Sequence, residues 1–120
     1  MKLFNESFLV SGDSTGEVTF WDTVHGTQLQ TFNQLKADIL TIEVNPKHGF
    51  VYASGVDSRV LSIQLTKQKS AQKWVVQNVF RGQSHDIRAL LLQDADHKLL
   101  SAGVTTDVCV YPLTNGRLPD

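Results

Sequence analysis

Cysteine and long apolar runs are scarce in this sequence of 120 residues, which contains a single cysteine. One cysteine cannot form an internal disulfide, so a disulfide-stapled secreted scaffold is excluded and a reducing intracellular compartment is expected. The longest apolar runs, such as 89–92, have four residues, and the first six residues lack the apolar core of about 7–15 residues that a signal peptide needs. The sequence therefore predicts neither a signal peptide nor a membrane span.

Signatures of catalysis and of metal binding are also missing. The four histidines, at 25, 48, 85 and 97, are widely separated and lack the short spacings of zinc ligands. No nucleophile elbow, phosphate-binding loop or Rossmann glycine pattern occurs. Cys109 and Tyr111 share the face of a predicted strand that is expected to be packed, and a thiol buried there is inert. We therefore expect no enzyme activity, no catalytic residue, no metal, no cofactor and no small-molecule substrate.

Acidic residues are absent between Ser58 and His85, although the net charge of the whole chain is only −1. This stretch carries +5 and the remainder carries −6. Such a block is either an interaction surface for an acidic partner or nucleic acid, or a solvated face whose charges point in different directions. Its cations are Arg59, Lys67, Lys69, Lys73 and Arg81.

An internal repeat is the main signal in the sequence. The glycines at 12, 55 and 103 each end a short apolar–small segment, and both intervals between them are in the forties. The interval from Asp38 to Gly55 is the same as the interval from Asp86 to Gly103. A period in the forties is typical of a four-stranded propeller blade. Because the aspartate–glycine spacing is constant, the extra residues of the longer unit are expected in a polar loop over 66–73, outside the strands.

Alternation of apolar and polar residues fits β-strands better than helices. Val18 and Phe20 share one face of the first unit, and Leu61 and Ile63 do the same in the second. Glycine, proline, asparagine and aspartate fall between these runs, where hairpins need turns. The predicted strands are 8–11, 17–22, 28–32, 39–44, 50–54, 59–64, 74–80, 87–92, 99–102 and 107–111.

The first unit resembles the WD-repeat family. Its sequence from Ser11 to Asp22 is similar to the Ser-Gly … Gly-x-Val-x-Val-Trp-Asp core of that family, whose members form β-propellers. The second unit has Gln64-Leu65 in place of Trp-Asp, and the third has Pro112-Leu113. The resemblance implies structural roles, rather than chemical ones, for Ser11, Gly12, Gly16, Trp21, Asp22, Gly55, His85, Asp86 and Gly103. An acid–base role for the His85–Asp86 pair is the alternative to a structural cap at the entry to a strand.

A narrower resemblance, to a WD-repeat subunit of the nucleolar small-subunit processome, covers nearly the whole chain. It rests on 17–22, on Lys73-Trp74-Val75, and on 84–90 leading into 101–103. This resemblance implies a nucleolar scaffold that holds processome proteins around precursor ribosomal RNA. The contacts to partner proteins are expected at one rim, from turn residues such as Asp38, Asp57, Asp86 and Arg88. The alternatives are direct RNA contact through 59–81, particularly through Lys67, Lys69 and Lys73, and an adaptor in an unrelated complex.

The chain is expected to form part of one propeller. The predicted division is an incomplete blade over 1–37, a complete blade over 38–85 and an incomplete blade over 86–120. No room is expected before Phe8 for an innermost strand. Propellers close with 4–8 blades, and an open stack exposes apolar end faces. The sequence is therefore expected to be a fragment, a truncated gene model or a short isoform, and to self-associate or aggregate when it is expressed alone.

Overall fold

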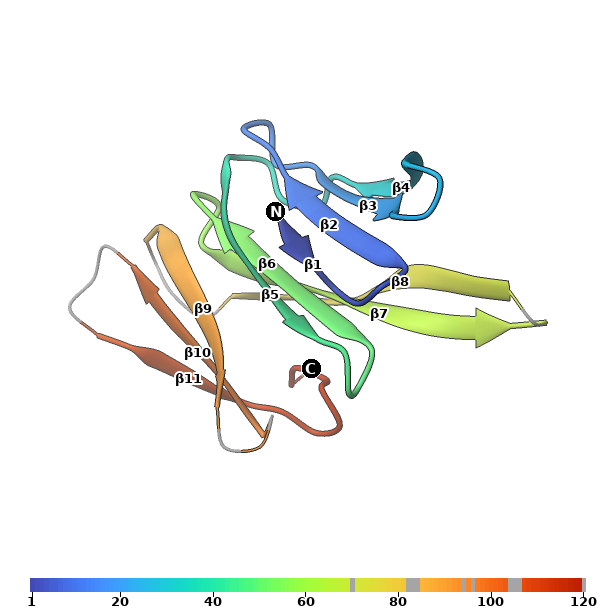
Figure 1. The fold of residues 1–120 in the computed structure, drawn as a ribbon. Coiled ribbons are helices and arrows are strands. Elements are labelled where there is room, and N and C mark those ends of the chain that lie inside the picture. The colour runs from blue at the N-terminus through green and yellow to red at the C-terminus, as the bar shows by residue number, and fades with distance from the viewer. Residues whose placement is uncertain (70, 82–84, 94, 96, 104–106, 120) are drawn as a thin grey trace.

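The computed structural model describes residues 1–69, 71–81, 85–93, 95, 97–103 and 107–119, and it contains no helix among them (Figure 1). Three antiparallel sheets of three or four strands follow one another along the described chain, so the expected all-β architecture of stacked propeller blades is confirmed. The first blade contains β1 (Lys2–Leu3), β2 (Phe8–Gly12), β3 (Val18–Asp22) and β4 (Thr27–Phe32). The second contains β5 (Ile39–Asn45), β6 (Phe50–Gly55), β7 (Arg59–Gln68) and β8 (Ala71–Arg81). The third contains β9 (Ile87–Gln93), β10 (Lys98–Gly103) and β11 (Cys109–Pro112).

Every predicted strand is present, but two expectations about their extent were wrong. The first blade does have a short innermost strand, because Lys2 and Leu3 pair with Val10 and Leu9 of β2. The extra residues of the second unit do not form a loop outside the strands. Instead β7 and β8 remain paired past Thr66 and Lys73 to Gln68 and Ala71. A polar sequence can extend a hairpin, because the hydrogen bonds between the two backbones do not need apolar side chains.

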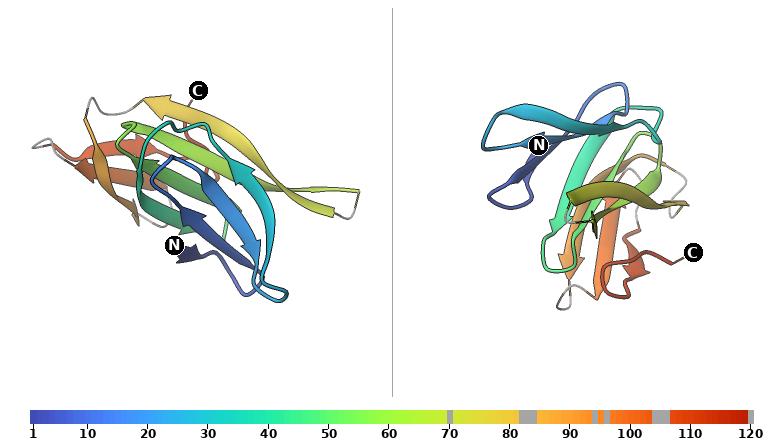
Figure 2. Two further views of the ribbon diagram at one scale, coloured as in Figure 1. Left: turned by 90° about the horizontal axis from the view of Figure 1, so that it is seen from above. Right: turned by 90° about the vertical axis from the view of Figure 1, so that its right-hand side faces the viewer.

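Two apolar cores lie between the three blades, so the middle blade is covered on both faces (Figure 2). Strand β6 shows this directly, since all of its residues are buried. Its side chains alternate between the cores: Val51 and Ala53 belong to the core shared with the first blade, Phe50 and Tyr52 to the core shared with the third. Alternation along a strand therefore assigns successive residues to different neighbours.

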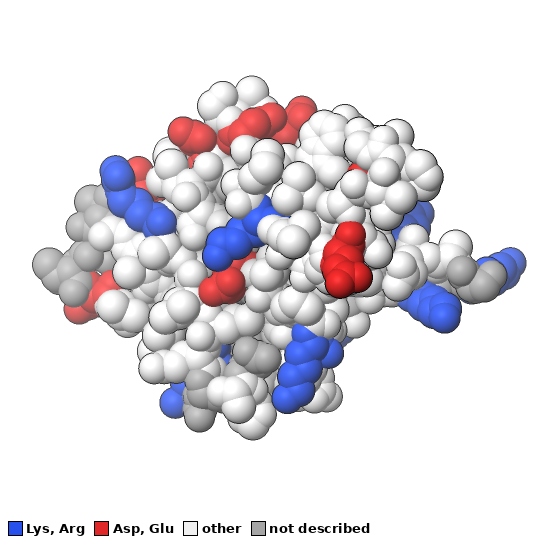
Figure 3. Space-filling view, viewed as in Figure 1, with Lys and Arg blue, Asp and Glu red and all other residues white. Residues whose placement is uncertain are grey.

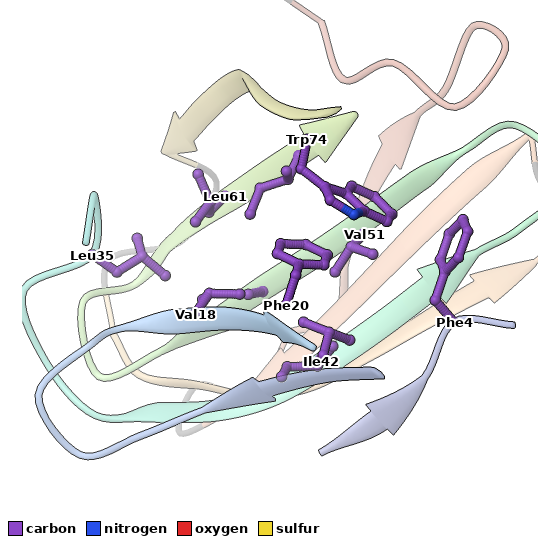
Figure 4. Close-up of a cluster of buried hydrophobic side chains, with 11 residues drawn as sticks. Phe4, Val18, Phe20, Leu35, Ile42, Val51, Leu61 and Trp74 are labelled. Atoms are coloured by element: carbon purple, nitrogen blue, oxygen red, sulfur yellow. The ribbon is translucent and has the colours of Figure 1, made fainter. Parts of the chain in front are cut away.

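Trp74 of β8 lies at the centre of the first core (Figure 4). Its ring stacks on Phe20 of β3, with centroids 4.2 Å apart, and meets Phe4 and Phe8 edge-on at 4.9 and 5.6 Å. The indole N–H is buried and has no hydrogen-bond partner among the described residues. This aromatic cluster joins the first blade to the second mainly by packing.

Residues that align between the first and second units, when Gly12 is matched with Gly55, face opposite sides of their strands. Val10 and Val18 of the first blade face the second blade. Their counterparts when Gly12 is aligned with Gly55 are Ala53 and Leu61, which face back toward the first blade. The residues that face forward in the second blade stand one position earlier and belong to the second core, as Tyr52 shows. A shift of one residue transfers every side chain to the opposite face of a strand. The alignment of the first unit was therefore wrong by one residue.

The constant spacing between aspartate and glycine has a steric cause. A Cβ on Gly55 would lie 2.1 Å from the carbonyl oxygen of Asp38, and a Cβ on Gly103 would lie 1.9 Å from that of Asp86. Both aspartates stand immediately before the innermost strand of their blade, where the chain enters against the end of the second strand. Only glycine permits this close backbone approach. The aspartate–glycine pair thus marks where the chain enters each of these two blades.

Candidate interaction surfaces

The turns of the blades form two rims, because successive turns of an antiparallel sheet alternate between its ends. The crossover rim contains the turns 13–17 and 56–58 and the connection 33–38. The hairpin rim contains the turns 4–7, 23–26 and 46–49 and the end of the hairpin β7–β8. The two proposed kinds of contact residue fall on different rims: the aspartates on the crossover rim and the lysines on the hairpin rim.

Asp57 and Arg59 hold the crossover rim together. The Arg59 guanidinium donates to both carboxylate oxygens of Asp57, at 2.6 and 2.8 Å, and also to the carbonyl oxygen of Gln34 at 3.2 Å. The backbone N–H of Lys36 donates to the same carboxylate at 2.8 Å. The hydrogen bonds from Arg59 and from this N–H hold the pKa of Asp57 below its ordinary value. The pair therefore ties the β6–β7 turn to the connection between blades.

The remaining candidates on the crossover rim serve the backbone or face solvent. The Asp38 carbonyl accepts from the N–H of Val56 at 3.1 Å, in the same turn as Asp57. Asp86 is half-buried, and its carbonyl lies against the end of β10. His85 and Arg88 are exposed on either side of it. Gln83 and Ser84, which stand where the family has its usual glycine before the histidine, are outside the described residues.

The lysines of the hairpin rim occupy the projecting end of β7–β8, where Figure 3 shows a group of basic side chains. Lys67 pairs with Gln72 in the register, and Lys73 pairs with Thr66. Because adjacent positions on a strand face opposite sides, Lys67 lies on the face of Trp74 and the first blade, and Lys73 lies on the other face. Lys69 lies at the turn of the hairpin with a φ of 48°.

The acid-free stretch 59–81 is thus not one continuous basic strip. Arg59 and Arg81 are paired in the register at the crossover end of the hairpin, close to Asp57. Lys67 is eight residues along the strand from Arg59, a distance of about 26 Å at roughly 3.3 Å per residue. The cations form one group that is partly neutralised by an aspartate and a second group at the hairpin end. The sequence shows their number, but strand length and pairing determine their grouping.

The WD-like residues of the first blade form hydrogen bonds within that blade. The indole N–H of Trp21 donates to the hydroxyl of Ser11 at 2.9 Å. Asp22 accepts from the N–H of Val24 at 2.8 Å and contacts the His25 ring at 2.8 Å. The hydrogen bond from His25 lowers the pKa of Asp22.

Two further glycines stand where the first blade meets the second. Gly16 has a φ of 94° and would, with a Cβ, meet the carbonyl oxygen of Leu35 at 2.3 Å. Gly12 lies against the side chain of Ile39. The turn and the strand end of the first blade therefore pack directly on the chain that enters the second.

A pair of glutamine clamps joins the outer strand of one blade to the backbone of the next blade, and sequence reasoning missed both. The Gln30 carboxamide of β4 accepts from the N–H of Trp74 at 2.8 Å and donates to its carbonyl oxygen at 3.0 Å. Gln77 of β8 bonds the N–H and carbonyl of Leu118 in the same way, at 3.2 and 3.4 Å. The interval from Gln30 to Gln77 is close to the repeat period, and this spacing is the signal that could have revealed them.

The described residues contain no cluster of metal-ligating side chains. No group of three histidine, cysteine, aspartate or glutamate side chains among them could hold a metal ion. Cys109 is partly buried against the second core, as expected. The hydroxyl groups of Tyr111 and Ser101 form a hydrogen bond of 2.7 Å, and burial raises the pKa of the Tyr111 hydroxyl. No helix in the described part of the chain is long and apolar enough to cross a membrane.

The chain is similar to curated proteins of eukaryotes, although no protein-family model matches it. It is 30% identical over 115 residues to U3 small nucleolar RNA-associated protein 4 of Schizosaccharomyces pombe, covering 94% of this chain and 16% of that protein. The namesake in Saccharomyces cerevisiae is 31% identical over 112 residues, covering 89% and 14%. A WD repeat-containing protein 89 homolog of Dictyostelium discoideum is 31% identical over 110 residues, covering 91% and 28%. The chain thus spans less than a third of the length of each of these relatives.

Proposed function

We propose, from its place among the WD-repeat proteins, that this chain is a non-catalytic scaffold segment for protein–protein assembly in the nucleolar small-subunit processome, where precursor ribosomal RNA is processed. The observation that carries the proposal is the similarity, over about nine-tenths of the chain, to proteins named for association with U3 small nucleolar RNA. The narrower resemblance of its strand motifs to cirhin, a WD-repeat subunit of the processome, supports the same assignment.

The stacked blades are suited to a scaffold. Turns of the first blade are held by their own hydrogen bonds, as Asp13 and Asp22 show by accepting from nearby backbone N–H groups. Rigid turns on a packed sheet present fixed side chains, which reduces the ordering cost of binding. Asp38, Asp86 and Arg88 remain our candidates for contacts with partner proteins on the crossover rim. Asp57 and Arg59 contribute there by holding the rim in shape.

The test is affinity purification of the tagged protein from nuclear extract. We expect co-purification of U3 small nucleolar RNA and of other processome proteins, measured by reverse-transcription PCR and mass spectrometry. A matched sample prepared after ribonuclease treatment separates protein contacts from contacts through RNA. Recovery of an unrelated assembly, without U3 RNA, would refute the processome assignment and favour a general WD-repeat adaptor.

Direct RNA contact is the second candidate, and the projecting lysines favour it. Lys67, Lys69 and Lys73 lie together at the hairpin end, away from the aspartates of the crossover rim. Binding through phosphates weakens steeply as salt rises, with a slope set by the number of contacts. If RNA binds here, titrations between low and physiological salt show that slope, and the double variant Lys67→Glu and Lys69→Glu removes it. No binding at low salt would exclude this candidate.

A further inference from the structure

A groove on the hairpin rim lies between the first blade and the extended hairpin. It is lined by Ser7, Phe8, Asp22, Val24, His25, Leu29 and Gln72, and has a volume of about 340 Å³. Six of these residues belong to the first blade, and Gln72 belongs to β8. The groove therefore depends on the extra length of β7–β8. Without the extension beyond Trp74, the wall formed by Gln72 would be missing.

The floor of this groove is apolar. Phe8 packs on the buried ring of Trp74, and the side chains of Leu29 and Val24 are 45% and 73% exposed beside it. Exposed aliphatic side chains gathered in a concave site are unusual on a solvated surface and indicate a binding site. Leu29 is also the additional residue where the β3–β4 register shifts, so a bulge places it at this edge.

The two walls of the groove differ in charge. Lys67 lies directly across the hairpin from Gln72, so its exposed side chain leaves the strand on the same face as the wall that Gln72 forms. On the other wall, the Asp22 carboxylate already accepts hydrogen bonds from His25 and from the Val24 backbone. The hairpin wall thus offers a cation beside an apolar floor.

We propose that this groove binds a short extended segment of a partner protein that carries both apolar and acidic side chains. The proposal deepens the scaffold function and rests on it, because it names the site and the chemistry of the partner. The apolar floor takes the aliphatic side chains, and Lys67 pairs with an acidic one. Nucleic acid fits less well, because its phosphates repeat at every nucleotide and the carboxylate of Asp22 lies on the opposite wall.

The experiment measures fluorescence anisotropy of a labelled eight-residue peptide of alternating leucine and aspartate, titrated with the chain. Saturable binding is expected. Leu29→Ser and Lys67→Glu should each weaken it about tenfold, since one removes the floor and the other the cation. Peptides that alternate serine with aspartate, or leucine with lysine, should bind at least about tenfold more weakly. Lys47→Glu, the same charge change elsewhere on this rim, is the control and should leave the affinity unchanged.

Lys73→Glu separates this proposal from RNA binding. Lys73 is on the opposite face of the same hairpin, so peptide affinity should not change when it is replaced. The peptide proposal would be overturned if the chain binds single-stranded RNA with an affinity that falls equally when Lys67 or Lys73 is replaced but does not change when Leu29 is replaced. Absence of peptide binding to the unsubstituted chain, shown by circular dichroism to be folded, would also overturn it.

The scaffold function is tested independently by recovery of U3 RNA with the tagged protein. If U3 RNA is recovered with the tagged protein and the peptide does not bind the unsubstituted chain, the groove proposal fails and the scaffold stands. If the peptide binds but U3 RNA is never recovered, the groove stands and the processome assignment fails.

Discussion

Replacing Gln30 tests the glutamine clamp most directly. Gln30→Met keeps the length of the side chain but removes both hydrogen bonds to the backbone of Trp74. At about 1 kcal/mol for each bond, the loss is about 2 kcal/mol of the free energy of unfolding. For a chain of this size, that corresponds to a fall of about 8 °C in the melting temperature. The Gln77 clamp has longer bonds, 3.2 and 3.4 Å, so Gln77→Met should cost about half as much.

Gln30→Glu adds a pH-dependent test of the same geometry. One carboxylate oxygen can still accept from the Trp74 N–H, but the other faces the Trp74 carbonyl oxygen and cannot donate to it. Protonation restores the donor, so the folded state raises the pKa of the new carboxyl above its unfolded value of about 4.3. The variant should therefore recover stability below that value and lose it as the pH rises through the raised pKa.

The assay is urea-induced unfolding, followed by circular dichroism at pH 7 and pH 4. The dependence of the unfolding free energy on urea concentration should be the same for each variant. Gln28→Met is the control, because Gln28 lies on the same strand but is exposed, and its side chain donates to the Thr31 hydroxyl at 2.9 Å. The reasoning would be refuted if Gln30→Met and this control differed by less than about 0.3 kcal/mol, a difference within ordinary scatter for surface substitutions.

Three further substitutions probe other contacts. Hydrogen bonds from Arg59 lower the pKa of Asp57, so the stability that ionised Asp57 contributes is present above about pH 4 and is lost as the pH falls through the lowered pKa. In Asp57→Asn, the urea midpoint should therefore depend less on pH between about pH 5 and pH 2. Gly55→Ala should cost about 2–3 kcal/mol by steric overlap with backbone, and Gly26→Ala, which has open space but a φ of 67°, about 1 kcal/mol in the same assay. Trp74→Ala should cost about 3–5 kcal/mol, and Trp74→Phe clearly less, because the unpartnered indole N–H is removed with most of the packing kept; equal melting temperatures for the two variants would contradict this account.

The strands and turns were predictable because they depend on neighbours in the sequence. Alternating apolar residues indicated each of the predicted strands, and Asn115-Gly116, a pair that favours tight turns, forms one with both residues at positive φ. The repeat was visible because glycine is required where the backbone at Asp38 and Asp86 enters the second and third blades. The aspartate–glycine spacing was therefore a sound guide to the second and third blades.

The surfaces were less predictable, since they depend on which strands lie beside each other. Asp57 was predicted as a contact for partners, and the sequence did not indicate that it pairs with Arg59 across a turn and holds the connection at Lys36. The hairpin insertion was expected to be a loop, because its sequence is polar. Polarity indicates exposure to solvent and does not show whether the two backbones remain paired.

The amino-acid sequence by itself determined the β class, the period of the repeat and the excess of positive charge over 59–81. Those properties are local, and they follow from alternation, turn residues and composition. Only the tertiary structure decided which face of the first blade meets the second, how the five cations divide between the two rims, and that Gln30 reaches Trp74, 44 residues away. These depend on strand register and on the packing of one sheet against another, and a change of one residue in register reverses the direction of every side chain.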